Sequence, residues 1–119
     1  MNTEQVQRLL RAIDDMNADA FVSFMTPQGT FKFGNAPPVQ GQAAVHALVD
    51  GFWKSIAGSR HTLLHLWNDG DDVAVHGEVT YTRKDDQQVT VAFVNVFRMK
   101  GDKIDSYLVH IDNGPLFAP

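Results

Sequence analysis

Histidine is the side chain best suited to proton transfer near neutral pH, and four of the five histidines lie between residues 60 and 112. Asp14 and Asp15 could supply a carboxylate that orients one of them, and Asn95 adds an amide. These residue types suit acid–base and electrostatic chemistry at a carbonyl or hydroxyl group. The four histidines are His61, His65, His76 and His110.

Other chemistries lack their motifs. The chain has no cysteine, which excludes disulfides, thiolate metal sites and cysteine nucleophiles. It has no HxH or HExxH metal motif, no glycine-rich nucleotide loop and no GxSxG elbow. We therefore expect neither a metal nor an organic cofactor. Nucleic acid is not expected as a partner, because the net charge is −4 and the basic residues form no stripe.

The size of the chain bounds its organisation. With 119 residues, 44% of them hydrophobic, residues 1–119 are expected to form a single domain around one core. No apolar run approaches the roughly 18 residues of a membrane span, and the N-terminal segment is too polar for a signal peptide. We expect a cytoplasmic protein without membrane contact.

Residues 60–112 predict four long strands. Runs of β-branched and aromatic residues are separated by NDGDD, RKDDQQ and MKGDK, which are typical of turns between antiparallel strands. Long strands twist and coil until one face of the sheet is concave. The first half of the chain predicts helices that would cover this face, so the expected fold class is α+β.

Helical periodicity marks three segments of that first half. The first helix is expected at about 3–16, and a short second helix begins after the N-cap Asn17 and ends at Thr26–Gly29. The third helix ends at Gly58 as its C-cap residue. Its apolar positions are Val45, Leu48, Val49, Phe52, Trp53 and Ile56.

The remaining segments are short. Residues 30–33 predict a strand, and the proline-containing stretch 34–38 predicts a loop. Residues 113–119 are too short and proline-bounded for another element. Leu116 and Phe117 in this tail are expected to dock, either on the edge of the core or on a partner chain.

Side-chain alternation predicts which strand residues share a face. His61, Leu63, His65 and Trp67 are expected on one face of their strand. In the next strand, hydrophobicity favours an inward set of Val73, Val75, Val79 and Tyr81. His76 and Glu78 would then lie on a solvated or subunit-facing surface. The alternative, in which these two residues line a polar pocket, depends on the strand register.

Two polar groups have more than one interpretation. Asn95 shares a face with the apolar residues Val91, Phe93 and Phe97, so its amide must find a partner. That partner is either a neighbouring strand residue such as Tyr107 or the oxygen of a ligand. The acids at 14 and 15 are either exposed at the helix end, or one of them turns inward toward the sheet.

Aromatic residues provide candidates for a pocket wall. Trp53 on the long helix is the first, with Phe21, Phe31 and Phe52 as further lining. The alternative is that all four are ordinary core residues, since aromatic stripes at helical spacing usually are.

The order of elements resembles the nuclear transport factor 2-like superfamily, and within it the SnoaL-like polyketide cyclase branch. The resemblance rests on AIDDMNADAFVSFM, RHTLLHLWNDGDDVAV and NVFRMKGDKI and extends over essentially the whole chain. It implies a cone-shaped, cystatin-like α+β fold, with N-terminal helices packed on a strongly curved antiparallel sheet. It also implies an apolar pocket between helix and sheet, and a homodimer formed through the outer face of the sheet.

The resemblance carries roles to individual residues. Asn95 stands where ketosteroid isomerase-like and SnoaL-like enzymes have a functional aspartate, while Phe33 and Leu9 stand at the isomerase base and tyrosine positions, which argues against steroid isomerisation. A branch resembling scytalone dehydratase has an acid near Asp14 and a histidine near His61.

By this resemblance, His61 is the general acid–base and Asp14 orients it. Asn95 and Tyr107 would hold the carbonyl or hydroxyl group of the ligand, and Trp53, Phe31 and Phe93 would line its site.

Two functions therefore remain. The first is a cofactor-independent acid–base enzyme of isomerase, cyclase or dehydratase type, which acts on a small hydrophobic carbonyl or hydroxyl compound. The second is a non-catalytic module that binds a small molecule or serves dimer assembly.

Overall fold

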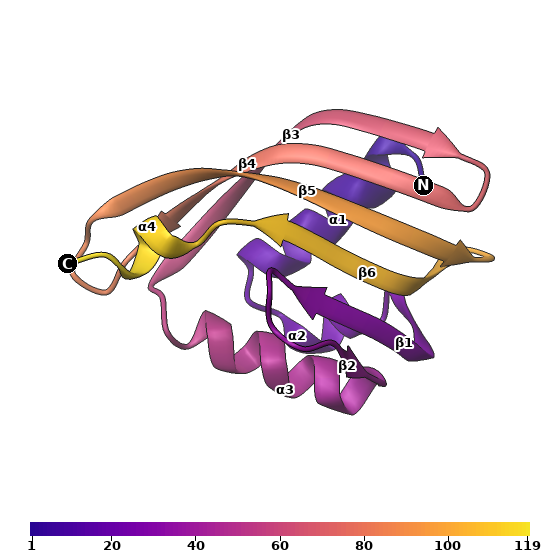
Figure 1. Ribbon diagram of the computed structural model, residues 1–119, viewed down its shortest axis with the longest axis horizontal. Coiled ribbons are helices and arrows are strands. Elements are labelled where there is room, and N and C mark those ends of the chain that lie inside the picture. The colour runs from indigo at the N-terminus through magenta and orange to yellow at the C-terminus, as the bar shows by residue number, and fades with distance from the viewer.

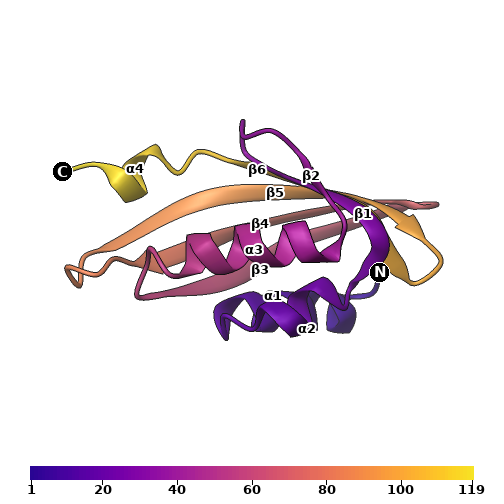
Figure 2. The ribbon, with the colours of Figure 1, turned by 90° about the horizontal axis from the view of Figure 1, so that it is seen from below.

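A computed structural model describes all residues, 1–119, as helices packed into the hollow of one curved sheet (Figures 1 and 2). The sheet has six strands in the order β2-β1-β6-β5-β4-β3. The elements are α1 Thr3–Asp14, α2 Ala18–Val22, β1 Met25–Phe33, β2 Val39–Gln40, α3 Gln42–Trp53, β3 Gly58–Asp69, β4 Asp72–Thr82, β5 Gln88–Lys100, β6 Lys103–Ile111 and α4 Gly114–Phe117. The predicted α+β class is confirmed.

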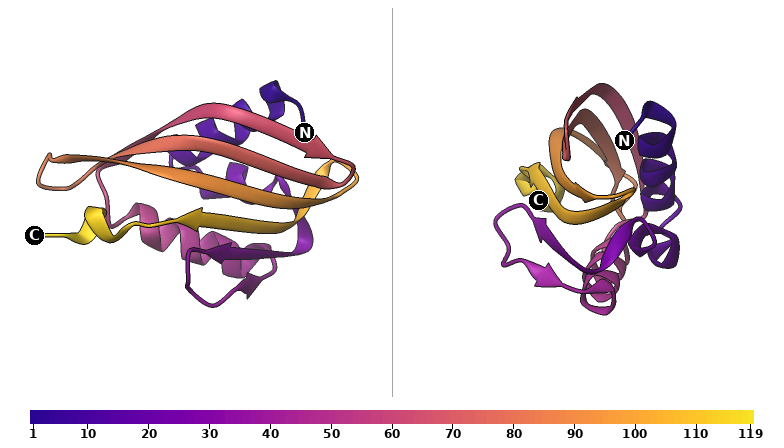
Figure 3. Two further views of the ribbon diagram at one scale, coloured as in Figure 1. Left: turned by 45° about the horizontal axis from the view of Figure 1, so that its top comes forward. Right: turned by 90° about the vertical axis from the view of Figure 1, so that its right-hand side faces the viewer.

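The long strands β3 to β6 form the predicted antiparallel meander and coil around the helices (Figure 3). Pairing between β1 and β6 is parallel, a detail that the turn signals did not indicate. A core of 22 buried residues fills the space between the helices and the concave face. The space inside the concave face that strand length predicted is therefore mostly filled by packed side chains.

The first helix begins with a capping box. The Gln5 amide donates to Asn2 Oδ1 at 2.8 Å, and the Asn2 amide donates to Gln5 Oε1 at 2.7 Å. The helix ends at Asp14, two residues before the expected end, and Met16 adopts a positive φ of 54°. This early turn leaves Asp14 at the very end of α1, where it meets the start of β3.

The second helix is shorter than predicted. Asn17 is its N-cap, as expected, but the helix ends at Val22, so Thr26–Gly29 does not terminate it. These residues belong to β1, which pairs with β6 and shifts register between Met25 and Thr30. The Thr26 hydroxyl donates to Asp105 Oδ1 at 2.7 Å. This pairing with a distant strand outweighs the local turn signal, because strand formation depends on its tertiary neighbours.

Gly58 is not the C-cap of the third helix. The helix ends at Trp53, and Ser55 Oγ donates to the Phe52 carbonyl in the turn that follows. The Ala57 amide then donates to the Thr82 carbonyl at 2.9 Å, which starts the ladder between β3 and β4. Gly58 is therefore the first residue of β3.

The faces of β4 follow hydrophobicity as predicted. Val73, Val75, Val79 and Tyr81 are buried, while Glu78 is exposed and His76 lies on the same outer face. His110 of β6 is also exposed on that face.

The face prediction for β3 is wrong, because a β-bulge interrupts its alternation. Leu63 pairs with Gly77 and His65 pairs with His76, so Leu64 is an extra residue without a partner. His61 and Leu63 therefore face inward, whereas His65 and Trp67 face outward. Trp67 is 54% exposed.

The C-terminal tail forms an element after all. Pro115 lies in the first turn of α4, where its missing N–H costs nothing. Leu116 is buried against the core of its own chain, whereas Phe117 is 66% exposed. Leu116 therefore docks on the core of its own chain, as one of the two alternatives predicted. Phe117 does not dock within the chain.

Candidate functional site

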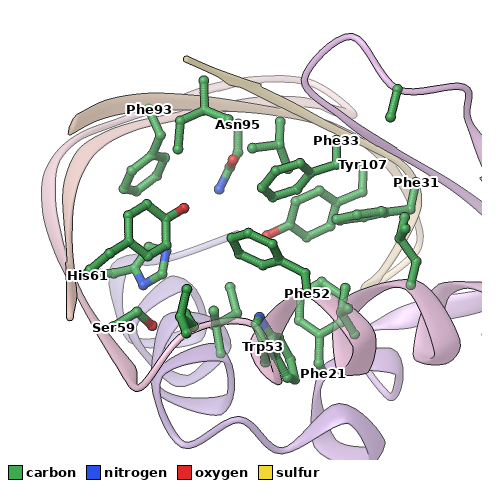
Figure 4. A pocket seen from close by; sticks show the side chains of 18 residues that line it. Phe21, Phe31, Phe33, Phe52, Trp53, Ser59, His61, Phe93, Asn95 and Tyr107 are labelled. Carbon is green, nitrogen blue, oxygen red and sulfur yellow. The ribbon is translucent and has the colours of Figure 1, made fainter. Parts of the chain in front are cut away.

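An apolar cavity of about 160 Å³ lies between α3 and the concave face of the sheet (Figure 4). Fifteen of its 18 lining residues are hydrophobic, and the other three are Ser59, His61 and Asn95. Among the lining residues, Phe33 and Phe52 are partly exposed, with ring centroids 5.0 Å apart, and Ala36 of the β1–β2 loop is exposed.

The aromatic residues predicted for the wall all line this cavity. They are Trp53, Phe21, Phe31, Phe52 and Phe93. Phe21 is the centre of an interlocked group, with ring centroids 5.8 Å from those of both Phe31 and Trp53. Because these three are also nearly fully buried, the interpretations of wall and core are both correct for them.

Asp14 and His61, which are 47 positions apart, are in direct contact. Asp14 Oδ1 lies 2.5 Å from His61 Nδ1, and Asp14 Oδ2 accepts a hydrogen bond of 2.8 Å from the His61 amide. Their side chains are 22% and 11% exposed. Of the two helix-end acids, Asp14 turns inward and Asp15 stays exposed.

Ser59 completes this arrangement, and the sequence interpretation missed it. Its hydroxyl donates to Asp14 Oδ1 at 2.9 Å. Ser59 and His61 are two residues apart in β3, so their side chains lie on the same inner face. That i, i+2 spacing was a signal available in the sequence.

Opposing effects act on the Asp14 carboxyl group. Burial by itself would raise its pKa, but hydrogen bonds from His61, the charge of His61 and the Ser59 hydroxyl more than offset this and hold the pKa below its ordinary value. Asp14 is therefore a carboxylate at neutral pH.

The carboxylate determines which nitrogen of His61 carries the proton. A carboxylate accepts hydrogen bonds, so Nδ1 is the protonated nitrogen and Nε2 of the neutral ring keeps a lone pair. Nε2 makes no hydrogen bond within the protein, and His61 lines the cavity. The ring is positioned as a proton acceptor with a carboxylate behind it.

Asn95 and Tyr107 point into the same cavity from β5 and β6 (Figure 4). Asn95 is 3% exposed, and its Oδ1 has no hydrogen-bond partner. The predicted structural partner, Tyr107, makes no hydrogen bond with it. The unpaired Oδ1 is an acceptor, so its partner must be a hydrogen-bond donor. The alternative interpretation, an amide that awaits a ligand oxygen, stays a prediction.

The two tyrosines of the cavity stay neutral over a wide pH range. Burial raises the pKa of Tyr107 far above its ordinary value of 10. Burial also raises the pKa of Tyr81 to about 12, with the Asn113 side chain opposing and the Asp14 charge adding to the effect. Their hydroxyls are hydrogen-bonding groups here rather than bases.

The other strand histidines do not reach the site. His65, His76 and His110 lie on the outer face of the sheet. No three histidine, aspartate or glutamate side chains are placed together to hold a metal ion. None of the helices is both long and apolar enough to span a bilayer.

Residues 6–107 match the family model of the SnoaL-like domain. The chain belongs to the SnoaL-like domain family, and it shares its fold with NTF2-like proteins. No curated protein sequence matches it.

Solved structures share the fold at low sequence identity. An NTF2-like protein of unknown function from Burkholderia pseudomallei has a TM-score of 0.86 and 17% identity, over 98% of this chain and 95% of that one. TerC, co-crystallised with polyporic acid, has a TM-score of 0.83 and 18% identity, over 95% and 92%. A putative SnoaL-like polyketide cyclase from Jannaschia has a TM-score of 0.78 and 19% identity, over 96% and 89%.

Proposed function

We propose that this SnoaL-like protein is a cofactor-independent acid–base enzyme that acts on a small hydrophobic carbonyl compound. The observation that carries the proposal is the Asp14–His61 pair at the wall of an apolar cavity, with His61 Nε2 free to accept a proton. The co-crystallisation of the similar TerC with polyporic acid supports small-molecule binding by this fold.

The chemistry begins with proton removal. His61 Nε2 takes a proton from a carbon next to the carbonyl group, and the C–H electron pair moves into an enolate. Asp14 stabilises the imidazolium that forms, because its carboxylate already faces Nδ1. The developing enolate oxygen receives a hydrogen bond from the Asn95 amide or the Tyr107 hydroxyl.

The second step returns the proton. The imidazolium protonates the same carbon, which gives exchange, or another carbon of the enolate, which gives isomerisation. If the compound carries a hydroxyl group one carbon further on, protonation of that group expels water and gives dehydration.

Deuterium incorporation tests the shared first step without knowledge of the natural substrate. Small cyclic ketones are incubated in D₂O, and exchange at the carbon next to the carbonyl is followed by NMR. We expect His61→Ala to reduce the protein-dependent rate by about 100-fold or more, the usual effect of general base catalysis. His65→Ala, four residues along the same strand but on the outer face, is the matched control and should exchange at the wild-type rate.

Unchanged exchange in the His61→Ala variant would remove this residue from the mechanism. Saturable binding without exchange in the wild-type protein would favour the second function, a non-catalytic binding module. The high apolar content of the cavity wall is the observation that supports this second function. Dimer formation through the outer face and a cytoplasmic location both stay predictions.

A further inference from the structure

We propose that the cavity selects neutral compounds about the size of one six-membered ring, each with an oxygen that hydrogen-bonds to Asn95. This inference rests on the proposed function for the identity of the site and adds the class of compound. It departs from multi-ring substrates because of the cavity volume, while the charge of the surroundings and the unpaired amide set the other two limits.

The volume limits the ligand to a single ring. An engineered cavity of about 150 Å³ in another protein holds one benzene molecule. The cavity here, about 160 Å³, is similar in size and smaller than the roughly 300–1,000 Å³ of ordinary drug-binding pockets.

The deep wall resists expansion. The ring of Phe21 contacts those of Phe31, Trp53 and Tyr107, at centroid distances of 5.8, 5.8 and 5.5 Å. Widening the cavity there would break packing contacts among nearly fully buried side chains. Phe33 and Phe52 are only half-buried, so adjustment is confined to the side that they line.

The charge of the surroundings excludes anions. None of the 18 lining residues is lysine or arginine, so the only side chain that could offer a bound carboxylate a positive charge is His61, which already faces Asp14. The negative charge of Asp14, directly behind His61, would repel a carboxylate bound in the cavity.

A cation would find no free charged acceptor. Asp14 Oδ1 already faces His61 Nδ1 and the Ser59 hydroxyl, and Oδ2 already accepts from the His61 amide. Aromatic faces attract cations, but an ammonium group would lose its hydrogen bonds to water in this cavity. Neutral molecules are therefore favoured over both charged classes.

Asn95 requires an oxygen on the ligand. Its side chain is almost completely buried among the apolar residues of the central strands, with Val75 and Val109 as its cross-strand neighbours. A buried amide without a partner costs about 1–3 kcal/mol. Its unpaired Oδ1 can accept a hydrogen bond from a ligand hydroxyl group, and its Nδ2–H₂ group can donate to a carbonyl or hydroxyl oxygen of the ligand.

Fluorescence of Trp53 can report on binding, because the chain has only two tryptophans. Trp67→Phe removes the exposed one and leaves the tryptophan of the cavity wall. The probes are cyclohexanone, cyclohexanecarboxylate, cyclohexylammonium and the fused two-ring ketone 2-decalone. None requires turnover, so binding is measured separately from catalysis.

We expect saturable binding of cyclohexanone with a Kd of about 1 mM or below, and at least about tenfold weaker binding of the other three probes. Equal or tighter binding of 2-decalone overturns the size limit, and equal or tighter binding of either ion overturns the charge limit. Absence of saturable cyclohexanone binding overturns the proposal as a whole.

The role of Asn95 is tested by Asn95→Leu, which keeps a similar shape without polar atoms. Cyclohexanone binding should weaken by about fivefold to tenfold, the value of one hydrogen bond, while methylcyclohexane should bind as it does to the parent protein. Equal weakening for both probes would mean that Asn95 shapes the cavity without recognising oxygen. If Asn95→Leu does not fold, the four-probe comparison on the parent protein still decides the size and charge limits.

The two proposals can fail separately. Selective cyclohexanone binding without deuterium exchange would refute the acid–base function and leave the compound class intact. Deuterium exchange of multi-ring ketones that depends on His61 would support the acid–base function and refute the proposed compound class.

Discussion

His61 and His65 belong to the same strand, yet one contacts a buried carboxylate at the wall of a cavity and the other lies on the outer face beside a second histidine. His61 Nδ1 faces Asp14, whereas His65 Nδ1 lies 3.2 Å from Nδ1 of His76. The extra residue Leu64 between them shifts the alternation of side chains, so that His65 lies on the opposite face of the sheet from His61. Residue type is the same in the two places, so the difference in chemistry comes from what each ring faces.

The outer pair has the geometry of a shared proton. The two rings are within 5° of parallel with centroids 5.4 Å apart, and their Nδ1 atoms lie 3.2 Å apart, at hydrogen-bond distance. Only one proton fits between them, and neither ring has a carboxylate that could stabilise a positive charge. The outer pair therefore lacks the feature that prepares His61 for proton transfer.

The largest expected effect concerns the residue opposite the bulge. A Cβ on Gly77 would lie 2.3 Å from the Thr62 carbonyl oxygen and 2.7 Å from the ring of Phe93, which itself contacts His61. We expect Gly77→Ala to lower the free energy of unfolding by about 3 kcal/mol, measured by chemical denaturation.

The control for this substitution is Gly51→Ala in α3, where a Cβ would meet nothing within 4 Å. Because alanine favours helix, we expect this variant to be more stable by about 0.5–1 kcal/mol. A Gly77→Ala variant as stable as the parent would show that the close approach at the bulge is not required.

The second prediction compares two aspartate–histidine pairs. Asp14→Asn should lower the free energy of unfolding at neutral pH by about 2 kcal/mol, because a partly buried carboxylate loses its charge-assisted hydrogen bonds. Asp19 pairs with His46 at 3.0 Å but is 93% exposed, so Asp19→Asn should leave stability unchanged. Equal effects of the two substitutions would contradict the assigned role of burial.

The pH dependence of the same variant gives a further check. The pKa of Asp14 is lowered by folding, so its stabilisation is fully present above its ordinary pKa of 3.8 and is lost as pH falls through the lower folded value. The stability difference between the parent protein and Asp14→Asn should therefore shrink below about pH 4. A difference that stays constant to pH 2 would contradict the lowered pKa.

The smallest expected effect is on the outer face. Replacing both His65 and His76 by glutamine should change the free energy of unfolding by about 0.5 kcal/mol or less, as is usual for surface substitutions. Deuterium exchange should stay at the wild-type rate. A large loss of exchange would show that the two faces of the sheet are coupled.

Much of the candidate site could be predicted from the sequence, but different residues were predicted from different kinds of signal. Hydrophobic alternation placed Asn95 among buried neighbours, and resemblance to a known fold suggested Asp14 and His61 as functional residues without showing that they touch. Ser59 was missed because a serine near a strand start has many roles. The unpaired state of Asn95 was one of two alternatives, since hydrogen-bond partners depend on positions in space.

The sequence by itself determined the order and type of the main elements, because helical periodicity, strand alternation and turn residues act over a few neighbouring positions. Only the tertiary structure decided the bulge at Leu64, the extension of β1 to Met25 and the contact between Asp14 and His61. Each of these depends on the register between segments that are distant along the chain. Register is set by how whole surfaces pack together, which no local pattern specifies.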